Sequence, residues 1–172
     1  MSHIIRPWAR KDLKAVVGLI RELASFHKAL DQVKTTPEML GDDGFGKDAT
    51  FGCLVAEVPP QQGSKGGGTI VGYQFHYMTY CTWDGHILFG EDLYVVPDFR
   101  GKGIGSSLLA KAAQMALAKG CSQIRFVSAN WNQPAVDFYT KLGAMNVTIQ
   151  NNWNLCSIEG EHVQKLAERA RK

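Results

Sequence analysis

Long apolar runs, a strong net charge and paired cysteines are all missing from this sequence of 172 residues. No apolar stretch approaches the ~20 residues that a helix needs to cross a bilayer. The N-terminal residues also lack the pattern of basic residues, apolar core and small-residue cleavage site that marks a secretory signal. We therefore expect a cytoplasmic protein that has no membrane partner.

The charge balance is nearly even, with 19 Lys and Arg against 16 Asp and Glu and a net charge of +3. This balance is too weak to indicate nucleic acid as a partner. A mildly positive surface would still help to attract a polyanionic cofactor.

The four cysteines, Cys53, Cys81, Cys121 and Cys156, lie far apart and form no C-x-x-C pair. This spacing indicates reduced thiols that mostly fill the core. No cluster of Cys and His has the spacing of metal ligands, so we expect no bound metal.

Apolar periodicity predicts a mixed α/β (α+β) fold, with residues 1–172 as a single domain. The segment Pro59–Gly68, rich in Pro, Gln, Gly and Ser, is expected to be a flexible hairpin connection. Strands are predicted at 3–7, 51–58, 70–80, 86–95, 123–128, 145–149 and 153–158. Helices are predicted at 12–27, after the capping pair Thr36-Pro37, from the Arg100–Gly105 segment to Gly120, at 134–142 and in the last residues.

A glycine-rich turn joins a strand to a helix in the segment Leu93-Tyr94-Val95-Val96-Pro97-Asp98-Phe99-Arg100-Gly101-Lys102-Gly103-Ile104-Gly105-Ser106. Glycines let the main chain approach a ligand closely, and the first turn of a helix carries unpaired N–H groups at the positive end of its dipole. With the charges of Arg100 and Lys102 they predict an anion site suited to a diphosphate. The alternative for an isolated glycine loop is a purely structural turn before a capped helix.

Two better-known glycine loops are excluded. A P-loop needs Gly-Lys-Ser/Thr, which is absent here. The dinucleotide fingerprint needs G-x-G-x-x-G and a later acidic residue, whereas this spacing is G-x-G-x-G and the later region reads Gln123-Ile124-Arg125.

The pattern Arg100-x-x-Gly103-x-Gly105 resembles the R-x-x-G-x-G/A signature of the GNAT superfamily of N-acetyltransferases, at the same junction of strand and helix. The segment Asn132–Ala144 is similar to the second cofactor segment of that family. The resemblance runs nearly end to end and narrows to the spermidine/spermine and thialysine acetyltransferases. It is carried by Ile20–Ala24, Asp31–Val33, Asp43–Gly46, Cys53–Glu57 and Trp131–Gln133, while Lys119–Gln123 is closer to the thialysine type.

This resemblance implies a mixed, mostly antiparallel, twisted sheet flanked by helices, acetyl-CoA as the cofactor, and a homodimer with sites near its interface. Main chain at Leu93–Val95 would pair with the pantetheine arm, and residues 101–106 would hold the diphosphate. The cofactor-binding residues that it implies are Leu93, Tyr94, Val95, Arg100, Gly101, Lys102, Gly103, Ile104, Gly105, Ser106, Asn132, Ala135 and Tyr139.

Acetyl transfer to an amine needs a proton acceptor on the amine side and a proton donor near the sulfur, because an alkylammonium has a pKa near ~10.4 and a thiol one near ~8.5. By the resemblance, Glu91 is the general base, acting through water, and Tyr139 is the general acid. Strand alternation predicts that Glu91 and Asp92 point to opposite faces, so Asp92 is expected to position the amine or brace the site. The structural alternatives are an edge-strand ion pair for the two carboxylates and a core position for Tyr139.

The expected substrate-binding residues are Phe26, His27, Cys81, Trp83, Glu91, Asp92, Arg125, Phe126, Val127 and Asn151. Polyamine acetyltransferases tend to carry an acid at four positions where this chain has His27, Cys81, Asn130 and Asn151. Each lost carboxylate removes ~1 kcal/mol or more of attraction for a further ammonium in a partly buried cleft. We therefore expect a smaller or less cationic amine, such as thialysine, a related amino acid or a monoamine, rather than spermine.

Other functions stay open at this point. A protein lysine or N-terminal acetyltransferase would use the same amine chemistry, and a non-catalytic CoA-binding interaction module would keep the fold alone. A Cys-His nucleophile using Cys81 or Cys121 has nothing to orient a base. His76 alternates with apolar neighbours, which is typical of a hydrogen-bonded core histidine.

Overall fold

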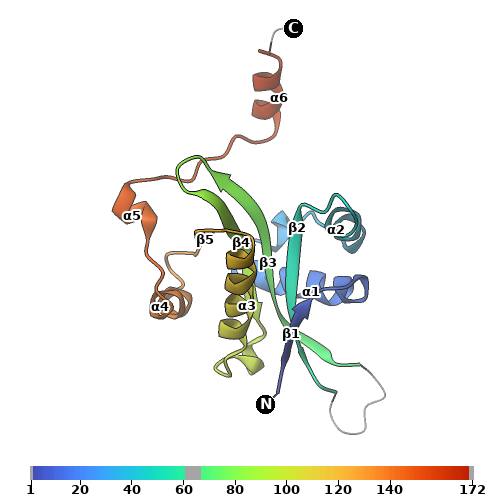
Figure 1. Ribbon diagram of the computed structural model, residues 1–172. Coiled ribbons are helices and arrows are strands. Elements are labelled where there is room, and N and C mark those ends of the chain that lie inside the picture. Colours follow the sequence, from blue (N-terminus) through green and yellow to red (C-terminus); the bar gives the residue numbers. More distant parts are fainter. Residues whose placement is uncertain (1, 61–66, 171–172) are drawn as a thin grey trace. The chain divides into compact units, whose positions relative to one another are not determined.

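The computed structural model describes residues 2–60 and 67–170, so most of the expected hairpin connection Pro59–Gly68 lies outside the described residues. The chain divides into two compact units, Met1–Val127 and Ser128–Lys172 (Figure 1). Helices long and apolar enough to cross a membrane do not occur in the described part of the chain.

The first unit is built on a sheet whose described strands follow the order β1-β2-β3-β4-β5. The strands β1 to β4 pair antiparallel, and only the pair β4–β5 is parallel. This confirms the mixed, mostly antiparallel sheet. The strands are β1 (Ile4–Pro7), β2 (Phe51–Val58), β3 (Thr69–Cys81), β4 (Gly85–Val95) and β5 (Gln123–Phe126).

Helices cover both faces of this sheet (Figure 1). On one face, α1 (Leu13–Phe26) buries Val16 and Leu19 against Trp8 and Tyr73, because its apolar residues recur at helical spacing. The short helix α2 (Pro37–Gly44) starts as predicted, since Thr36 Oγ1 accepts a hydrogen bond from the N–H of Met39 at 3.2 Å. Three short 3-10 turns are η1 (Arg10–Asp12), η2 (Leu30–Gln32) and η3 (Pro97–Phe99).

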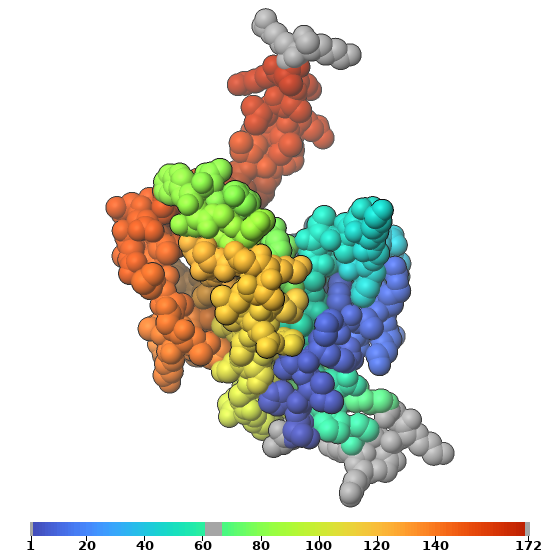
Figure 2. Space-filling model, in the orientation of Figure 1, coloured from blue at the N-terminus to red at the C-terminus, as the bar shows by residue number. Residues whose placement is uncertain are grey.

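The helix α3 (Ile104–Ala118) packs on the opposite face. Its residues Ile104, Leu108 and Ala112 are buried against β2 and β3. Figure 2 shows this helix (yellow) beside the first residues of the chain (blue). There the Ser107 hydroxyl donates to the Gly103 carbonyl at 2.9 Å and accepts from His3 Nε2 at 3.0 Å, which ties the first turn of α3 to the chain next to β1.

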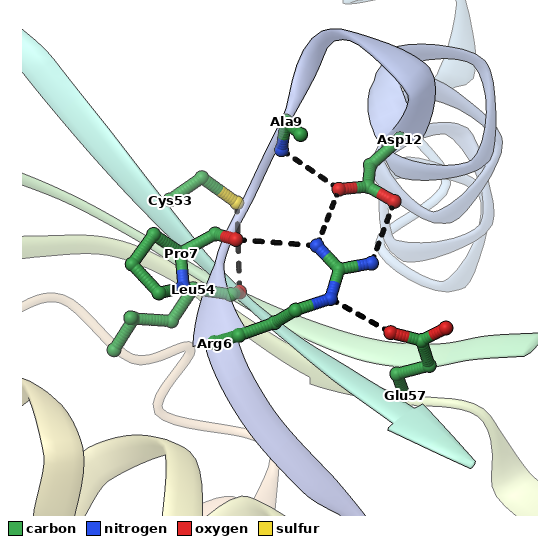
Figure 3. Close-up of polar contacts among 7 residues, drawn as sticks. All are labelled: Arg6, Pro7, Ala9, Asp12, Cys53, Leu54 and Glu57. Atoms are coloured by element: carbon green, nitrogen blue, oxygen red, sulfur yellow. Dashed lines mark hydrogen bonds and ion pairs between the residues drawn. The ribbon is translucent and has the colours of Figure 1, made fainter. Parts of the chain in front are cut away.

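A partly buried ion cluster fixes the first strand to the first helix (Figure 3). The Arg6 guanidinium donates to both oxygens of Asp12, at 2.7 and 2.9 Å, and to Glu57 Oε2 on β2 at 2.7 Å. The N–H of Ala9 donates to Asp12 at 2.7 Å. The hydrogen bonds from Arg6 hold the pKa of the Asp12 carboxyl below its ordinary value, against the opposing effect of burial.

The second unit contains α4 (Gln133–Lys141), α5 (Val147–Asn151) and α6 (Glu161–Ala167). The predicted strands at 145–149 and 153–158 are wrong. Asn146 Oδ1 accepts from the N–H of Ile149 at 3.3 Å and so starts a helical turn, which Asn152 ends with a φ of 56°. Residues 153–158 have no strand partner among the described residues, and an alternating apolar pattern forms a strand only where a sheet accepts it.

Candidate active site

The segment Arg100–Ser106, which we call the cradle, connects η3 to α3. Gly101 and Gly103 have φ values of 72° and 80°, in the left-handed region that other residues rarely adopt. Among the described residues, no hydrogen bond uses a main-chain N–H of residues 101–106 as its donor. These N–H groups at the positive end of a 15-residue helix suit an anion.

Two cations stand at the cradle, and both side chains help to hold the loop. Arg100 Nε donates to the Val95 carbonyl at 2.7 Å, and its guanidinium lies 5.3 Å from the ring centroid of Tyr94. Lys102 Nζ donates to the Asp98 carbonyl at 3.0 Å and lies 5.0 Å from the ring centroid of Phe99. Their charges therefore sit beside the unused N–H groups.

Strand β4 carries a bulge at Glu91. Phe75 of β3 pairs with Asp92 and His76 pairs with Gly90, so Glu91 is an extra residue without a counterpart. The pairing of β4 with β5 also stops here, because it runs only from Ile87 to Gly90. Within the described residues, the edge of β4 from Glu91 to Val95 thus has no β5 neighbour, which leaves main-chain groups at Leu93–Val95 open to an extended ligand.

The bulge corrects the prediction that Glu91 and Asp92 point to opposite faces. The Tyr73 hydroxyl donates to Asp92 Oδ2 at 2.8 Å, and the Tyr77 hydroxyl donates to Glu91 Oε2 at 3.3 Å. Tyr73 and Tyr77 are four residues apart on β3, so they leave the strand on the same face. Both carboxylates therefore lie on the face that α1 covers, because an inserted residue breaks the strict alternation of a strand.

The two carboxylates have different surroundings. Asp92 is partly buried, and this burial raises the pKa of its carboxyl above the ordinary value. The Tyr73 hydrogen bond and the charge of His27 oppose the rise, while the charge of Glu91 adds to it. Glu91 is exposed. The pKa of Tyr73 is raised far above its ordinary range by burial, so this phenol stays a proton donor in the hydrogen bond.

Sequence reasoning missed three side chains at this site. Tyr73 and Tyr77 hold the carboxylates, and Glu22 of α1 accepts from the Tyr94 hydroxyl at 3.1 Å. A tyrosine in a strand is usually core, and only the register of β3 against β4 reveals these partners. The available signal was that Tyr73 and Tyr77 are four residues apart in one predicted strand, so that both hydroxyls leave it on the same face. The next predicted strand carries the acidic pair.

The expected substrate residues of the first unit fall into two groups. Phe26 and His27 end α1 on the carboxylate side, with ring centroids 5.4 Å apart, and Phe126 pairs with Gly90 next to the bulge. Val127 follows β5 and is exposed.

The other group lies at the turn between β3 and β4. Cys81 Sγ lies 3.6 Å from Asp84 Oδ2, Arg125 forms an ion pair with the same carboxylate at 3.5 Å, and Trp83 is exposed. This turn is six residues from the bulge along β4, roughly 20 Å in an extended strand. Even within the first unit, the structure therefore does not bring all of the expected substrate residues together at one place.

The remaining expected residues belong to the second unit. Asn132 lies just before α4, and Ala135 and Tyr139 follow it at intervals of three and four residues, so the three share one side of the helix. The rings of Tyr139 and Phe138 are 5.2 Å apart. Asn151 is the last residue of α5.

His76 is a core residue, as its strand pattern predicted. It is 5% exposed, and its Nδ1 donates to Gln74 Oε1 at 2.7 Å. Burial lowers the pKa of this imidazole. In the part of the chain that the structure describes, no three His, Cys, Asp or Glu side chains are placed to hold a metal ion.

The family model for the acetyltransferase (GNAT) family matches residues 19–144. Thialysine N-epsilon-acetyltransferase from Sus scrofa is 45% identical over 166 residues, which cover 96% of this chain and 98% of that protein. Spermidine/spermine N(1)-acetyltransferase-like protein 1 from Homo sapiens is 36% identical over 156 residues, or 91% of this chain and 22% of that protein.

A solved structure of an integron cassette protein from the mobile metagenome of V. cholerae has a TM-score of 0.74 at 21% identity, covering 98% of this chain and 99% of its own. At this identity the likeness concerns the fold alone. The matched family model and the extent of the sequence identity, together with a glycine cradle after a bulged strand, show that this chain belongs to the acetyltransferase (GNAT) family and is an acetyltransferase.

Proposed function

We propose that the protein transfers the acetyl group of acetyl-CoA to the primary amine of a small molecule. The observation that carries the proposal is the arrangement along β4, where two carboxylates at a bulge precede an open strand edge that leads directly to the cradle. The amine and the diphosphate of a thioester cofactor would thus be bound by consecutive parts of one strand and turn.

The residues fit a CoA diphosphate. The unused N–H groups of residues 101–106 would donate to its oxygens, and Arg100 and Lys102 would neutralise its charge. Bound acetyl-CoA would supply the activated acetyl thioester. The open edge of β4 at Leu93–Val95 would pair with the pantetheine arm, and Asn132, Ala135 and Tyr139 would contact the cofactor from α4.

The amine side requires one group to bind the ammonium and one to take its proton. Glu91 and Asp92 supply these two functions from the same face of the sheet, and the resemblance assigns proton acceptance to Glu91. Tyr139 is proposed to give a proton to the departing sulfur. The resemblance implies that residues 1–172 work as one catalytic domain.

The proposed substrate is a small amine with few positive charges. The positions His27, Cys81, Asn130 and Asn151 offer no carboxylate to a second or third ammonium. The Sus scrofa relative named for thialysine is 45% identical, against 36% for the Homo sapiens spermidine/spermine N(1)-acetyltransferase-like protein 1, so thialysine or a related amine is favoured over spermine.

We further propose a cytoplasmic homodimer. The second unit has no buried residue among 128–170 and exposes large apolar side chains such as Trp153 and Leu155, at 57% and 86%. A second copy would cover such a surface. Light scattering during size-exclusion chromatography should give twice the mass of the chain, and a monomer would contradict this part of the proposal.

A thermal shift with acetyl-CoA and a thiol-release assay on a substrate panel test the function. Saturation near 100 Kd should raise the unfolding free energy by ~2.7 kcal/mol. The panel should contain thialysine, lysine, simple monoamines, spermidine, spermine and lysine peptides, and we expect the highest kcat/KM for small amines. Strong preference for spermine or for peptides would refute the substrate class, and the lack of any shift or thiol release would refute the function itself.

A further inference from the structure

A pair of buried polar side chains lies at the bulge, on the face of the sheet opposite to the two carboxylates. Gln74 is 1% exposed and His76 is 5% exposed, and neither takes part in the mechanism proposed above. They alternate along β3 with Tyr73 and Tyr77, which hold the carboxylates on the other face. They also stand on either side of Phe75, the residue at which the pairing with β4 shifts by one.

The hydrogen bonds of this pair end on the main chain at the shift. Gln74 Nε2 donates to the Phe75 carbonyl at 3.0 Å, and His76 Nδ1 lies 2.7 Å from Gln74 Oε1. Since a carbonyl oxygen can only accept, the amide nitrogen must face Phe75, and the amide oxygen accepts from the Nδ1–H of His76. Burial lowers the pKa of the His76 imidazole, which agrees with a neutral ring that carries its proton on Nδ1.

The neighbouring strands leave room for the pair. On β4, a Cβ built on Gly90 would lie 3.5 Å from Gln74 Nε2, so the amide lies against the residue next to the inserted Glu91. On β2, Gly52 pairs with His76, and a Cβ built on Gly52 would lie only 2.8 Å from the imidazole Nε2. The imidazole therefore fills the space that this glycine leaves, and the pair reaches from β2 to the bulge of β4.

We infer that Gln74 and His76 are positioning residues that fix the bulge of β4 and thereby the places of its two carboxylates. The inference rests on the proposed function and adds two residues to that site. A bulge disrupts the ladder locally, and a slip of β4 by one residue would carry its side chains to the opposite face. A fully hydrogen-bonded buried pair favours one arrangement, because another arrangement would leave its polar groups unpaired.

The role concerns the amine side of the reaction. The pair contacts β4 at Gly90, next to the carboxylates, whereas the cradle that is proposed to hold the diphosphate begins only at Arg100. Displacing a catalytic group by about 1 Å can cost ~10²-fold in rate. Loss of the pair should therefore lower kcat and leave the Kd for acetyl-CoA unchanged.

The test replaces both side chains by apolar ones of similar volume in Gln74→Met/His76→Leu. Because neither partner remains to be left unpaired, Tm should stay within about 3 °C of the wild type or rise. In the thiol-release assay with acetyl-CoA and thialysine, or the amine that the substrate panel ranks first, kcat should fall about 10–100-fold. The single variant His76→Leu leaves Gln74 Oε1 without its donor, so its Tm should fall by at least about 2 °C.

Leu54 supplies the matched control. It is fully buried and pairs with Gln74 from β2, but its side chain is apolar. Leu54→Ala should lower Tm by at least about 4 °C and keep kcat near the wild-type value. In a Glu91→Gln background the double replacement should lower kcat by a smaller factor than in the wild type, because both changes act on the same carboxylate.

Wild-type kcat in the double variant, or a loss no larger than that of Leu54→Ala, overturns the inference, and so does an equal loss in the Glu91→Gln background. If the double variant does not fold, His76→Gln, which keeps a donor, should retain more kcat than His76→Leu, and equal values overturn the inference. A wild type that acetylates no amine of the panel refutes the proposed function and this inference together. An active wild type with an equally active double variant refutes only the inference.

Discussion

Gly103 allows the cradle to be tested separately from the stability of the fold. It has a φ of 80°, and a Cβ built on it would meet no atom within 4 Å. Gly120, just after the other end of α3, has a φ of 75° and is equally open. The two glycines are separated by the whole 15-residue helix, about 22 Å. Alanine at either position meets the same backbone strain, and only Gly103 lies in the cradle.

The expected magnitudes follow from this geometry. The left-handed backbone should cost each alanine variant about 1–2 kcal/mol of unfolding free energy. For a chain of this size, Tm falls by about 2–4 °C for each kcal/mol. In Gly103→Ala the new methyl group would also stand where the diphosphate approaches the N–H groups, and we expect the Kd for acetyl-CoA to rise at least tenfold.

A thermal shift with and without acetyl-CoA separates the two effects. At a concentration of 100 Kd for the wild type, the cofactor should stabilise the wild type and Gly120→Ala by about 2.7 kcal/mol, and Gly103→Ala by at most about 1.4 kcal/mol. Steady-state KM for acetyl-CoA should rise in the same variant. Equal stabilisation of the two alanine variants would refute the cradle as the cofactor site.

Three further predictions concern the ion cluster and the proposed acid. Arg6→Met should lower the unfolding free energy by about 3–5 kcal/mol in urea titrations, because it leaves the buried Asp12 and also Glu57 without their cation; a loss below 1 kcal/mol would contradict the cluster's role. The pKa of Asp12 is lower in the folded protein, so its contribution to stability is fully present above the unfolded pKa near ~3.9 and is lost as pH falls through the folded pKa. In Asp12→Asn the unfolding free energy should therefore depend less on pH below ~4, and an unchanged slope would argue against this role. Tyr139→Phe should reduce kcat by about 10²–10⁴-fold while the acetyl-CoA thermal shift is kept, and an unchanged kcat would remove Tyr139 from the mechanism.

The first unit was predictable because its signals are local. Leu13, Val16 and Ile20 recur at helical spacing, and Thr36 caps the helix that it precedes. The glycine turn could likewise be placed between a strand and a helix, since positive φ values at Gly101 and Gly103 follow from the residue type.

The site was less predictable because it depends on strand register. A bulge inserts one residue into β4 beside Gly90, a glycine inside the strand that could have signalled it. Strict alternation instead placed the two carboxylates on opposite faces. The tyrosine partners on β3 follow from the same pairing. The failed strands after Ala144 have different causes. At 145–149 the Asn146 side chain accepts a hydrogen bond from the N–H of Ile149 and starts a helical turn, and 153–158 have no strand partner among the described residues.

In the proposed mechanism, the bulge is what would let one short stretch of β4 serve both the amine and the cofactor. Without the extra residue, Glu91 would face α3, and only Asp92 would face the side where Tyr73 waits to donate. With it, a second carboxylate joins that face and the pairing with β5 ends at Gly90, which leaves the rest of β4 open up to the cradle. Deleting Glu91 would therefore change more than one side chain, because it would remove the bulge together with the carboxylate. A Glu91→Ala variant keeps the insertion, so comparing the two would measure the geometry of the strand apart from the charge that it carries.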